Sequence, residues 1–442
     1  MDNIQLQKMM MTKTKIAQSQ SFTKFIRINI KFGALLAIVI FGIIYIIFQP
    51  LSVDSDSDIA LNVEISVAEQ LKTIVNCDNK NFTIEIIQTD KFLILKNYIK
   101  ASKYFECHES ITYTTQGEFT FLENIIPVIK RWRAPMSVAV YSPGSDLMSA
   151  MNVIFYLRNC NAATDLVKEY VSFHIFFDRM EYNENNILTL YERLEVTLKC
   201  SHAAKFLKVH QNETYRIKNK LSYPINAARN IARTAATTYF VFACDIELYP
   251  NPNFVDQFFE MIIDDKDGKW MEEKNVFVFA VFEILTNETI PDIKQDLIKL
   301  VNEQKVFLFH SHICLECHMI PGVELWLNDT DYTSMKVITT AKRQGPFFHW
   351  EPFYVGTNND PLFDDRITYE RSSDKMSQAY TMCVMDYNFN VLSNAFLVHK
   401  NGVKTNRPTR QPGFKEGVNF LLNVALPEIS SKYGEREGCR LS

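Results

Sequence analysis

Apolar and polar positions follow two periods along the chain, and these periods predict strands and helices in alternation. Segments that are almost continuously apolar, or rich in β-branched and aromatic residues, predict strands at 110–116, 136–142, 171–178 and 237–250. Apolar positions spaced three or four apart predict helices at 119–131, 146–158 and 224–236. Strands that alternate with helices are typical of an α/β fold, in which helices cover both faces of a mostly parallel sheet.

The first long apolar segment predicts a membrane anchor. Residues 32–48 form a run of 17 positions without a charge, close to the lower limit for a helix that spans a bilayer. Positive charge before this run favours a cytosolic N-terminus and places the remaining chain in the lumen. A cleaved signal peptide is the alternative, but no A-x-A-like cleavage site follows the run. The predicted organisation is a tail at 1–31, an anchor at 32–48, a stem with a small subdomain at 49–103 and a main domain at 104–442.

Composition excludes several classes of protein. Of the 442 residues, 47% are hydrophobic and 22% are charged, which is ordinary for a globular protein and excludes a mostly disordered chain. The formal net charge is −4, and no basic stripe occurs after residue 31. We therefore expect no nucleic-acid partner.

Cysteines and glycosylation sequons agree with a lumenal main domain. Sequons occur at Asn81, Asn212, Asn287 and Asn328, all after the anchor. The nine cysteines also follow the anchor, and most should form disulfides in an oxidising compartment. Because nine is odd, at least one thiol stays free or pairs between chains, and Cys244, in an apolar strand, is the candidate for a buried free thiol.

A C-x-x-C-H segment at 314–318 matches the patterns of haem attachment and of half a zinc site. No second pair of zinc ligands with suitable spacing is evident in the sequence. We therefore expect Cys314 and Cys317 to form disulfides.

Two acidic residues close the last predicted strand. Asp245 and Glu247 are two positions apart, so their side chains would point to the same side of an extended chain. At the carboxyl edge of a parallel sheet, such side chains face the crevice where ligands bind. Carboxylate oxygens in that place suit Mg²⁺ or Mn²⁺ bridged to a diphosphate. A solvated strand end before the turn at 250–252 is the alternative without a metal.

Longer segments of the chain resemble glycosyltransferase family 49. The segment YPINAARNIARTAATTYFVFACDIELYP is similar to the core of nucleotide-sugar transferases with the GT-A fold, where a helix bearing Arg-Asn precedes a strand that ends in a D-x-D metal motif. The W-E-P-F-Y-V, F-D-x-R and A-F-L-V-H blocks resemble the C-terminal part of the family, which contains β-1,4-glucuronyltransferases of α-dystroglycan glycosylation and the second catalytic domain of LARGE-type enzymes. ITYTTQ and RAPMSVAVYSP match its opening strands. The resemblance covers roughly 104–410 and implies a GT-A (Rossmann-like) catalytic domain.

The resemblance also implies roles for individual residues. Asp245 and Glu247 would form the metal motif, although the family more usually has Asp at the second position, and His399 would complete the metal site. The residues implied at the nucleotide sugar are Thr114, Thr115, Gln116, Arg229 and Asn230.

An inverting transferase needs a carboxylate that takes the proton of the acceptor hydroxyl. The candidates in this chain are Asp364, Asp365, Glu370 and Asp374. Asp364 belongs to the F-D-x-R block, while Asp374 opens a predicted helix at the place where several GT-A families keep their base. Arg366 would orient Asp364 or bind an acidic sugar. Trp350 and Tyr354 are either a stacking wall for sugar rings or core residues.

The sequence therefore predicts a type II Golgi membrane glycosyltransferase. The expected reaction is the inverting transfer of glucuronic acid from UDP-glucuronate to a glycan acceptor, such as a terminal xylose in dystroglycan-type O-mannosyl glycosylation, with Mn²⁺ or Mg²⁺ as cofactor. One alternative is a GT-A transferase with another UDP-sugar donor. A second alternative is a catalytically silent relative that binds glycans or a partner protein, which the D-x-E departure from D-x-D keeps open.

Overall fold

A computed structural model describes residues 66–181, 198–367, 374–400, 402–406 and 414–441. The chain divides into two units, residues 1–64 and 65–442, and the described residues all belong to the second. The predicted tail and anchor lie outside the described residues. Within the described part of the chain, no helix is both long enough and apolar enough to cross a bilayer.

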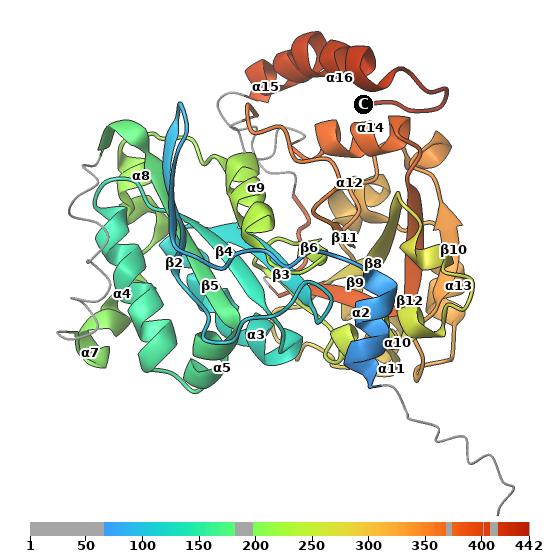
Figure 1. Cartoon of the computed structure of the whole chain (residues 1–442), viewed down its shortest axis with the longest axis horizontal. Coiled ribbons are helices and arrows are strands. Elements are labelled where there is room, and N and C mark those ends of the chain that lie inside the picture. The colour runs from blue at the N-terminus through green and yellow to red at the C-terminus, as the bar shows by residue number, and fades with distance from the viewer. Residues whose placement is uncertain (1–65, 182–197, 368–373, 401, 407–413, 442) are drawn as a thin grey trace, which may run out of the picture. The chain divides into compact units, whose positions relative to one another are not determined.

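The described strands form one sheet of twelve strands (Figure 1). Its order is β1-β2-β5-β4-β3-β6-β11-β8-β12-β10, with β7 paired to β12 and β9 paired to β8. The strands are β1 (Glu85–Gln88), β2 (Phe92–Ile99), β3 (Ile111–Gly117), β4 (Met136–Tyr141), β5 (Val171–Asp178), β6 (Phe240–Ala243), β7 (Leu248–Pro250), β8 (Asn275–Ile284), β9 (Val306–Leu308), β10 (Val337–Ala341), β11 (Tyr354–Thr357) and β12 (Asn388–His399).

Helices connect most of these strands. They are α2 (Val67–Val75), α3 (Ile125–Trp132), α4 (Asp146–Asn159), α5 (Thr164–Tyr170), α7 (Cys200–Ala203), α8 (Tyr215–Lys218), α9 (Ile225–Ala235), α10 (Phe254–Asp264), α11 (Lys294–Asn302), α12 (Ser311–His318), α13 (Val323–Asn328), α14 (Met376–Val384), α15 (Phe414–Phe420) and α16 (Leu426–Tyr433). Figure 1 shows α15 and α16 beside α14, in the C-terminal part of the chain.

The predicted parallel sheet is confirmed for one half of the molecule. Strands β5, β4, β3 and β6 run parallel to one another, as expected for strands joined through helices, whereas β2 is antiparallel to β5. Beyond β6 the sheet is mixed, because β11 runs antiparallel to both β6 and β8. Strand β12 then pairs in parallel with β8 over most of its length.

Helices cover both faces of the sheet, as predicted. Along β4, Val138 and Val140 belong to a core cluster with residues of α3 and α4, while Ala139 and Tyr141 belong to a separate cluster with α9. Successive side chains of a strand point to opposite faces, which explains this division. The nearly continuous apolar sequence of the central strands follows from burial on both sides.

The predicted strand at 237–250 is wrong in its middle. The structure has β6 up to Ala243 and β7 from Leu248, with a turn at 244–247 between them. The chain leaves the first strand because β7 pairs with β12 instead of continuing beside β3. Ile246 is buried in the core and fixes the turn, so that the acidic residues on either side of it remain partly exposed.

The predictions for cysteine are confirmed. Four disulfides join Cys77 to Cys107, Cys160 to Cys200, Cys314 to Cys317 and Cys383 to Cys439. Cys244 is the remaining cysteine, and it is free and buried. The four sequon asparagines, Asn81, Asn212, Asn287 and Asn328, are all exposed.

Candidate active site

A cavity of about 560 Å³ opens at the carboxyl ends of β3 and β6. This is the edge of a parallel sheet at which α/β proteins bind ligands. Segments far apart in the sequence line it: the end of β3, the turn at 244–247, part of α12, the residues before α14 and the end of β12. The cavity brings Asp245, Glu247, Asp374 and His399 together with Gln116.

Helix α9 positions one side of the cavity. Ala228 and Ala232 are fully buried against the sheet, and their small side chains allow close packing. The next residue after Ala228 is Arg229, which lines the cavity although it is itself buried. Arg229 donates one hydrogen bond to Asp374 and another, of 3.2 Å, to Oδ1 of Asp245. Burial alone would lower the pKa of Arg229, but Asp374 and Asp245 outweigh burial and raise it.

Asp245 is held between two cations. Lys375 donates a hydrogen bond of 3.1 Å to Oδ2, while Arg229 occupies Oδ1. Burial alone would raise the pKa of Asp245, but Lys375 and Arg229 hold it well below its usual range. Asp245 is therefore ionised at physiological pH, with both oxygens bound.

The pairing of β7 with β12 brings Glu247 close to His399. In the antiparallel pair of β7 and β12, His399 lies opposite Leu248, the neighbour of Glu247. Nε2 of His399 lies 3.9 Å from Oε2 of Glu247. Burial, together with Lys404 and His310, lowers the pKa of His399 to about 3, so the ring is neutral at physiological pH. A neutral imidazole is the form that binds metal ions.

The donors of this cavity fit a divalent cation. Glu247 and His399 offer a carboxylate oxygen and a neutral ring nitrogen, while Nδ1 of His399 is buried and makes no hydrogen bond to any described residue. Among the described residues, no three His, Cys, Asp or Glu side chains form a complete ligand cluster, and both carboxylate oxygens of Asp245 are bound by cations. Mg²⁺-type sites commonly have few protein ligands and are completed by substrate phosphates. The donor set suits an ion that is bound together with a diphosphate.

Only some of the residues that the resemblance places at the nucleotide line the cavity. Gln116 lines the cavity and accepts a hydrogen bond from Tyr223, a residue that also lines it. Thr114 and Thr115 are buried within β3 and do not line the cavity. Asn230 instead holds a loop, since its amide group bonds both the carbonyl oxygen and the N–H of Phe363.

The candidate proton acceptors differ in their surroundings. Asp374 lines the cavity. Asp364 does not, and its carboxylate accepts hydrogen bonds of 2.9 and 2.8 Å from Arg366. Arg366 also binds Glu428 of α16, so Asp364 belongs to an ion-pair network with that helix. Asp365 is exposed, and Glu370 lies outside the described residues.

The aromatic residues of the W-E-P-F-Y-V block belong to the core. Trp350 is 1% exposed, and Tyr354 donates a hydrogen bond to Sδ of Met382. Neither lines the cavity of about 560 Å³. The interpretation of these two residues as core is confirmed.

Three kinds of cavity residue were missed from the sequence. Lys375 binds Asp245, and Glu351 lines the cavity. At the cavity wall, the ring of His310 stacks on Phe309 and the ring of His318 packs against Phe309 at a tilt. Burial lowers the pKa of His318 well below its ordinary value, so this ring is neutral too. Glu351 could have been found from the sequence, because it lies inside the W-E-P-F-Y-V block that resembles the family.

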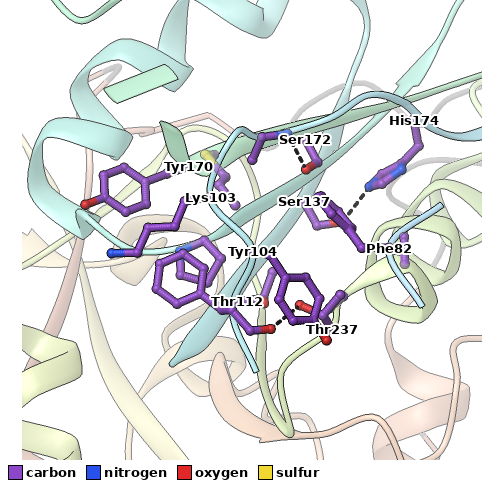
Figure 2. A pocket seen from close by; sticks show the side chains of 15 residues that line it. Phe82, Lys103, Tyr104, Thr112, Ser137, Tyr170, Ser172, His174 and Thr237 are labelled. Carbon is purple, nitrogen blue, oxygen red and sulfur yellow. Dashed lines mark hydrogen bonds between the residues drawn. The ribbon is translucent and has the colours of Figure 1, made fainter. Parts of the chain in front are cut away.

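A smaller cavity, of about 30 Å³, lies near the amino ends of the same parallel strands (Figure 2). There His174 is fully buried, with Nδ1 accepting a hydrogen bond from the N–H of Asn97 and Nε2 lying 2.8 Å from Oγ of Ser137. Ser137 in turn donates to the carbonyl oxygen of Ala232. All side-chain polar atoms of Ser137 and His174 therefore have hydrogen-bond partners. The pair links α9 to the sheet and is structural.

Comparison with known proteins gives consistent similarities. Residues 110–434 match the model of a family described as "Glycosyl-transferase for dystroglycan". The chain is 28% identical over 299 residues to zebrafish (Danio rerio) beta-1,4-glucuronyltransferase 1, an alignment that covers 65% of each chain and so less than two thirds of the relative. It is 25% identical over 319 residues to human beta-1,4-glucuronyltransferase 1, covering 70% of this chain and 69% of the relative. It is 24% identical over 243 residues to zebrafish xylosyl- and glucuronyltransferase LARGE2s, covering 54% of this chain and 31% of the relative.

The family match covers most of the described chain and includes every residue of the cavity. Its N-terminal limit coincides with the start of β3, and its C-terminal limit follows α16 directly. The mixed α/β sheet with a cavity at its carboxyl edge agrees with a GT-A domain. The chain belongs to glycosyltransferase family 49, the family of glycosyl-transferases for dystroglycan.

Proposed function

We propose that this protein transfers glucuronic acid from UDP-glucuronate to a glycan acceptor, with inversion at the anomeric carbon. The observation that carries the proposal is the cavity at the carboxyl edge of the sheet, which Asp245, Glu247 and His399 all line. Similarity to beta-1,4-glucuronyltransferases supports the choice of glucuronic acid as the donor sugar. A terminal xylose on a dystroglycan-type O-mannosyl glycan is the proposed acceptor, in keeping with the family description.

A divalent cation, Mn²⁺ or Mg²⁺, is part of the proposal. Glu247 and His399 would hold it, with Asp245 as a further carboxylate beside them. When bound, such an ion neutralises the charge that develops on the leaving diphosphate. Arg229 and Lys375 add fixed positive charge at the same place, and because they are positioned by Asp245 they need no rearrangement as the charge develops.

We further propose that the protein is a type II membrane protein of the Golgi with a lumenal catalytic domain. The apolar run at 32–48 and the basic tail before it support the anchor and its orientation. Four disulfides and four exposed sequon asparagines in the described residues support an oxidising, glycosylating compartment.

The experiment that tests the activity uses the full chain, purified in a mild detergent. It is incubated with Mn²⁺ and a panel of UDP-sugars, with and without β-xylosides, and UDP release is followed. Release that needs UDP-glucuronate and the xyloside, and that stops on addition of a chelator, is the expected result. Release only with another UDP-sugar would change the proposed donor, for example to UDP-xylose if the chain acts like the xylosyltransferase named in the LARGE2s relative. If a folded sample releases UDP from no donor, the alternative is favoured in which the protein is catalytically silent and binds glycans or a partner protein.

A further inference from the structure

Glu351 is a carboxylate of the cavity without an assigned role. It precedes β11 and lines the cavity of about 560 Å³ together with Asp374 and Lys375. A second cavity, of about 20 Å³, shares Glu351, Lys375 and Arg229 with the first. Glu351 therefore lies among the charged groups at the centre of the site.

The other carboxylates of the cavity already have partners. Asp245 is bound by Lys375 and Arg229, and Asp374 is bound by Arg229. The remaining two acids also have contacts: Glu118 forms an ion pair with Arg216, and Glu247 lies 3.9 Å from the neutral ring of His399. In the described part of the chain, by contrast, the carboxylate of Glu351 takes part in no hydrogen bond and no ion pair, so both of its oxygens are available to a ligand.

The main chain around Glu351 is held firmly in place. Its N–H donates a hydrogen bond of 2.8 Å to the carbonyl oxygen of Cys317, and its own carbonyl oxygen lies 3.3 Å from Nδ1 of His318. The carbonyl oxygen of the preceding residue, Trp350, accepts a hydrogen bond of 2.8 Å from Arg343. These bonds fix the main chain from which the side chain of Glu351 reaches into the cavity.

We propose that the carboxylate of Glu351 accepts the hydroxyl proton of the acceptor sugar, an inference that rests on the proposed transferase function. The acceptor oxygen forms a bond to the anomeric carbon of the donor, and the bond from that carbon to the diphosphate breaks. The electron pair of the broken bond leaves with UDP, and the hydroxyl proton passes to an oxygen of Glu351. The proton is later released to solvent, which returns Glu351 to its ionised form.

The charges around Glu351 suit this role. Burial raises the pKa of Glu351, Lys375 opposes that effect and Asp374 adds to it. The guanidinium groups of Arg229 and Arg343 also oppose it, while His318 of α12 is neutral. A base works best when its pKa lies near the pH at which the enzyme operates, and a raised pKa moves Glu351 in that direction.

The test compares three full-length variants in detergent: Glu351→Gln, Glu351→Asp and, as a matched control, Glu324→Gln. Glu324 is exposed on α13 and lies outside the cavity. We expect Glu351→Gln to lower turnover with UDP-glucuronate and xyloside by about 10²- to 10⁴-fold, the usual contribution of a general base. The KM for the donor and the Kd for UDP should stay within about threefold, because the proton acceptor adds little to donor binding. Glu351→Asp should recover part of the turnover, and Glu324→Gln should match the wild type.

The wild-type pH profile provides a second measurement that needs no folded variant. The kcat/KM for the acceptor should fall on the acidic side with the slope of one proton, above the ordinary glutamate pKa of about 4.3. The inference is overturned if Glu351→Gln keeps more than about a third of the wild-type turnover, if UDP binding falls together with turnover, or if the wild type shows no acidic limb. A wild type that releases no UDP from any donor overturns both the proposed function and this inference, whereas an active wild type with an active Glu351→Gln variant overturns the inference alone.

Discussion

Nζ of Lys375 lies 3.1 Å from Oδ2 of Asp245, although the two residues are 130 positions apart in the sequence. With Arg229 on the other oxygen, the carboxylate is shared by two positive side chains. The first residue of the D-x-E motif therefore organises the cations of the cavity.

Asp245→Asn should remove most of the transferase activity. An amide leaves Arg229 and Lys375 with one negative partner fewer, and it is a weaker metal ligand. Losing a preorganised electrostatic contribution of this kind lowers turnover by about 10²- to 10³-fold. Asp256→Asn is the matched control, because Asp256 is exposed on α10 and lies outside the cavity. Equal turnover of the two variants, measured as UDP release, would contradict this role of Asp245.

His399→Ala should weaken metal binding while the fold stays intact. The variant removes one of the two donors that face each other, so the Mn²⁺ concentration at half-maximal activity should rise by about 10-fold or more. Metal titration of UDP release measures the shift, and a melting curve checks the fold. An unchanged metal requirement would show that His399 is not a ligand.

Asp364→Asn should leave turnover within about threefold of the wild type. The carboxylate lies outside the cavity lining and is bound by Arg366, whose other partner is Glu428. These groups are partly exposed, so the loss of stability should stay near or below about 1 kcal/mol. If the variant instead turned over at least about 100-fold more slowly, with UDP binding preserved, Asp364 would be identified as the proton acceptor.

His174 should make stability depend on pH. Burial lowers the pKa of His174 to about 3, whereas in the unfolded chain it is about 6.5. Between these values the unfolded chain binds a proton that the folded chain does not, so the contribution is complete above about pH 6.5 and is lost as the pH falls below it. The free energy of unfolding should fall by about 1.4 kcal/mol per pH unit from this group.

The pH effect is measured by melting curves between pH 7 and 5 on the wild type and two variants. His174→Asn keeps an acceptor for the N–H of Asn97 and should reduce the slope by one proton. His312→Asn replaces an exposed histidine and serves as the control. The same slope in all three proteins would rule out the buried, neutral state of His174.

The disulfides should differ in their contributions to stability. Cys383 and Cys439 are 56 positions apart, and removing this cross-link with alanines should cost about 4 kcal/mol from chain entropy. Cys314 and Cys317 are only 3 positions apart, and the same change there should cost about 1.5 kcal/mol. Denaturant unfolding of the two double variants measures the difference, and equal losses would contradict the entropic account.

Local patterns predicted much of the fold. The strand at 171–178 was predicted with the limits it has as β5, and the helix at 224–236 differs from α9 by one residue at each end. The helix has a clear apolar period, and the strand is almost continuously apolar because the sheet buries both of its faces. The division of 237–250 could not be predicted, because it depends on the pairing of Leu248 with His399, a contact between distant parts of the chain.

The site was predictable where it follows a strand end or a family block. Asp245, Glu247 and His399 were all named from the sequence, and all line the cavity. Lys375 was not, because its role is an ion pair whose partner lies in a turn far away in the sequence. Thr114 and Thr115 were placed at the nucleotide from their position near the end of β3, but the cavity begins only at Gln116.

The pairing of β7 with β12 has a consequence for biosynthesis. Translation adds residues from the N-terminus, and His399 follows Asp245 only after another strand-rich stretch that includes β8 and β11. Strand β12 is also the partner of β8 and β10. Until residue 399 has left the ribosome, the nascent chain contains the turn at 244–247 but lacks the complete β12 strand that pairs with β7. The site therefore cannot be completed before residue 399 has emerged, and a chain terminated before that residue lacks it.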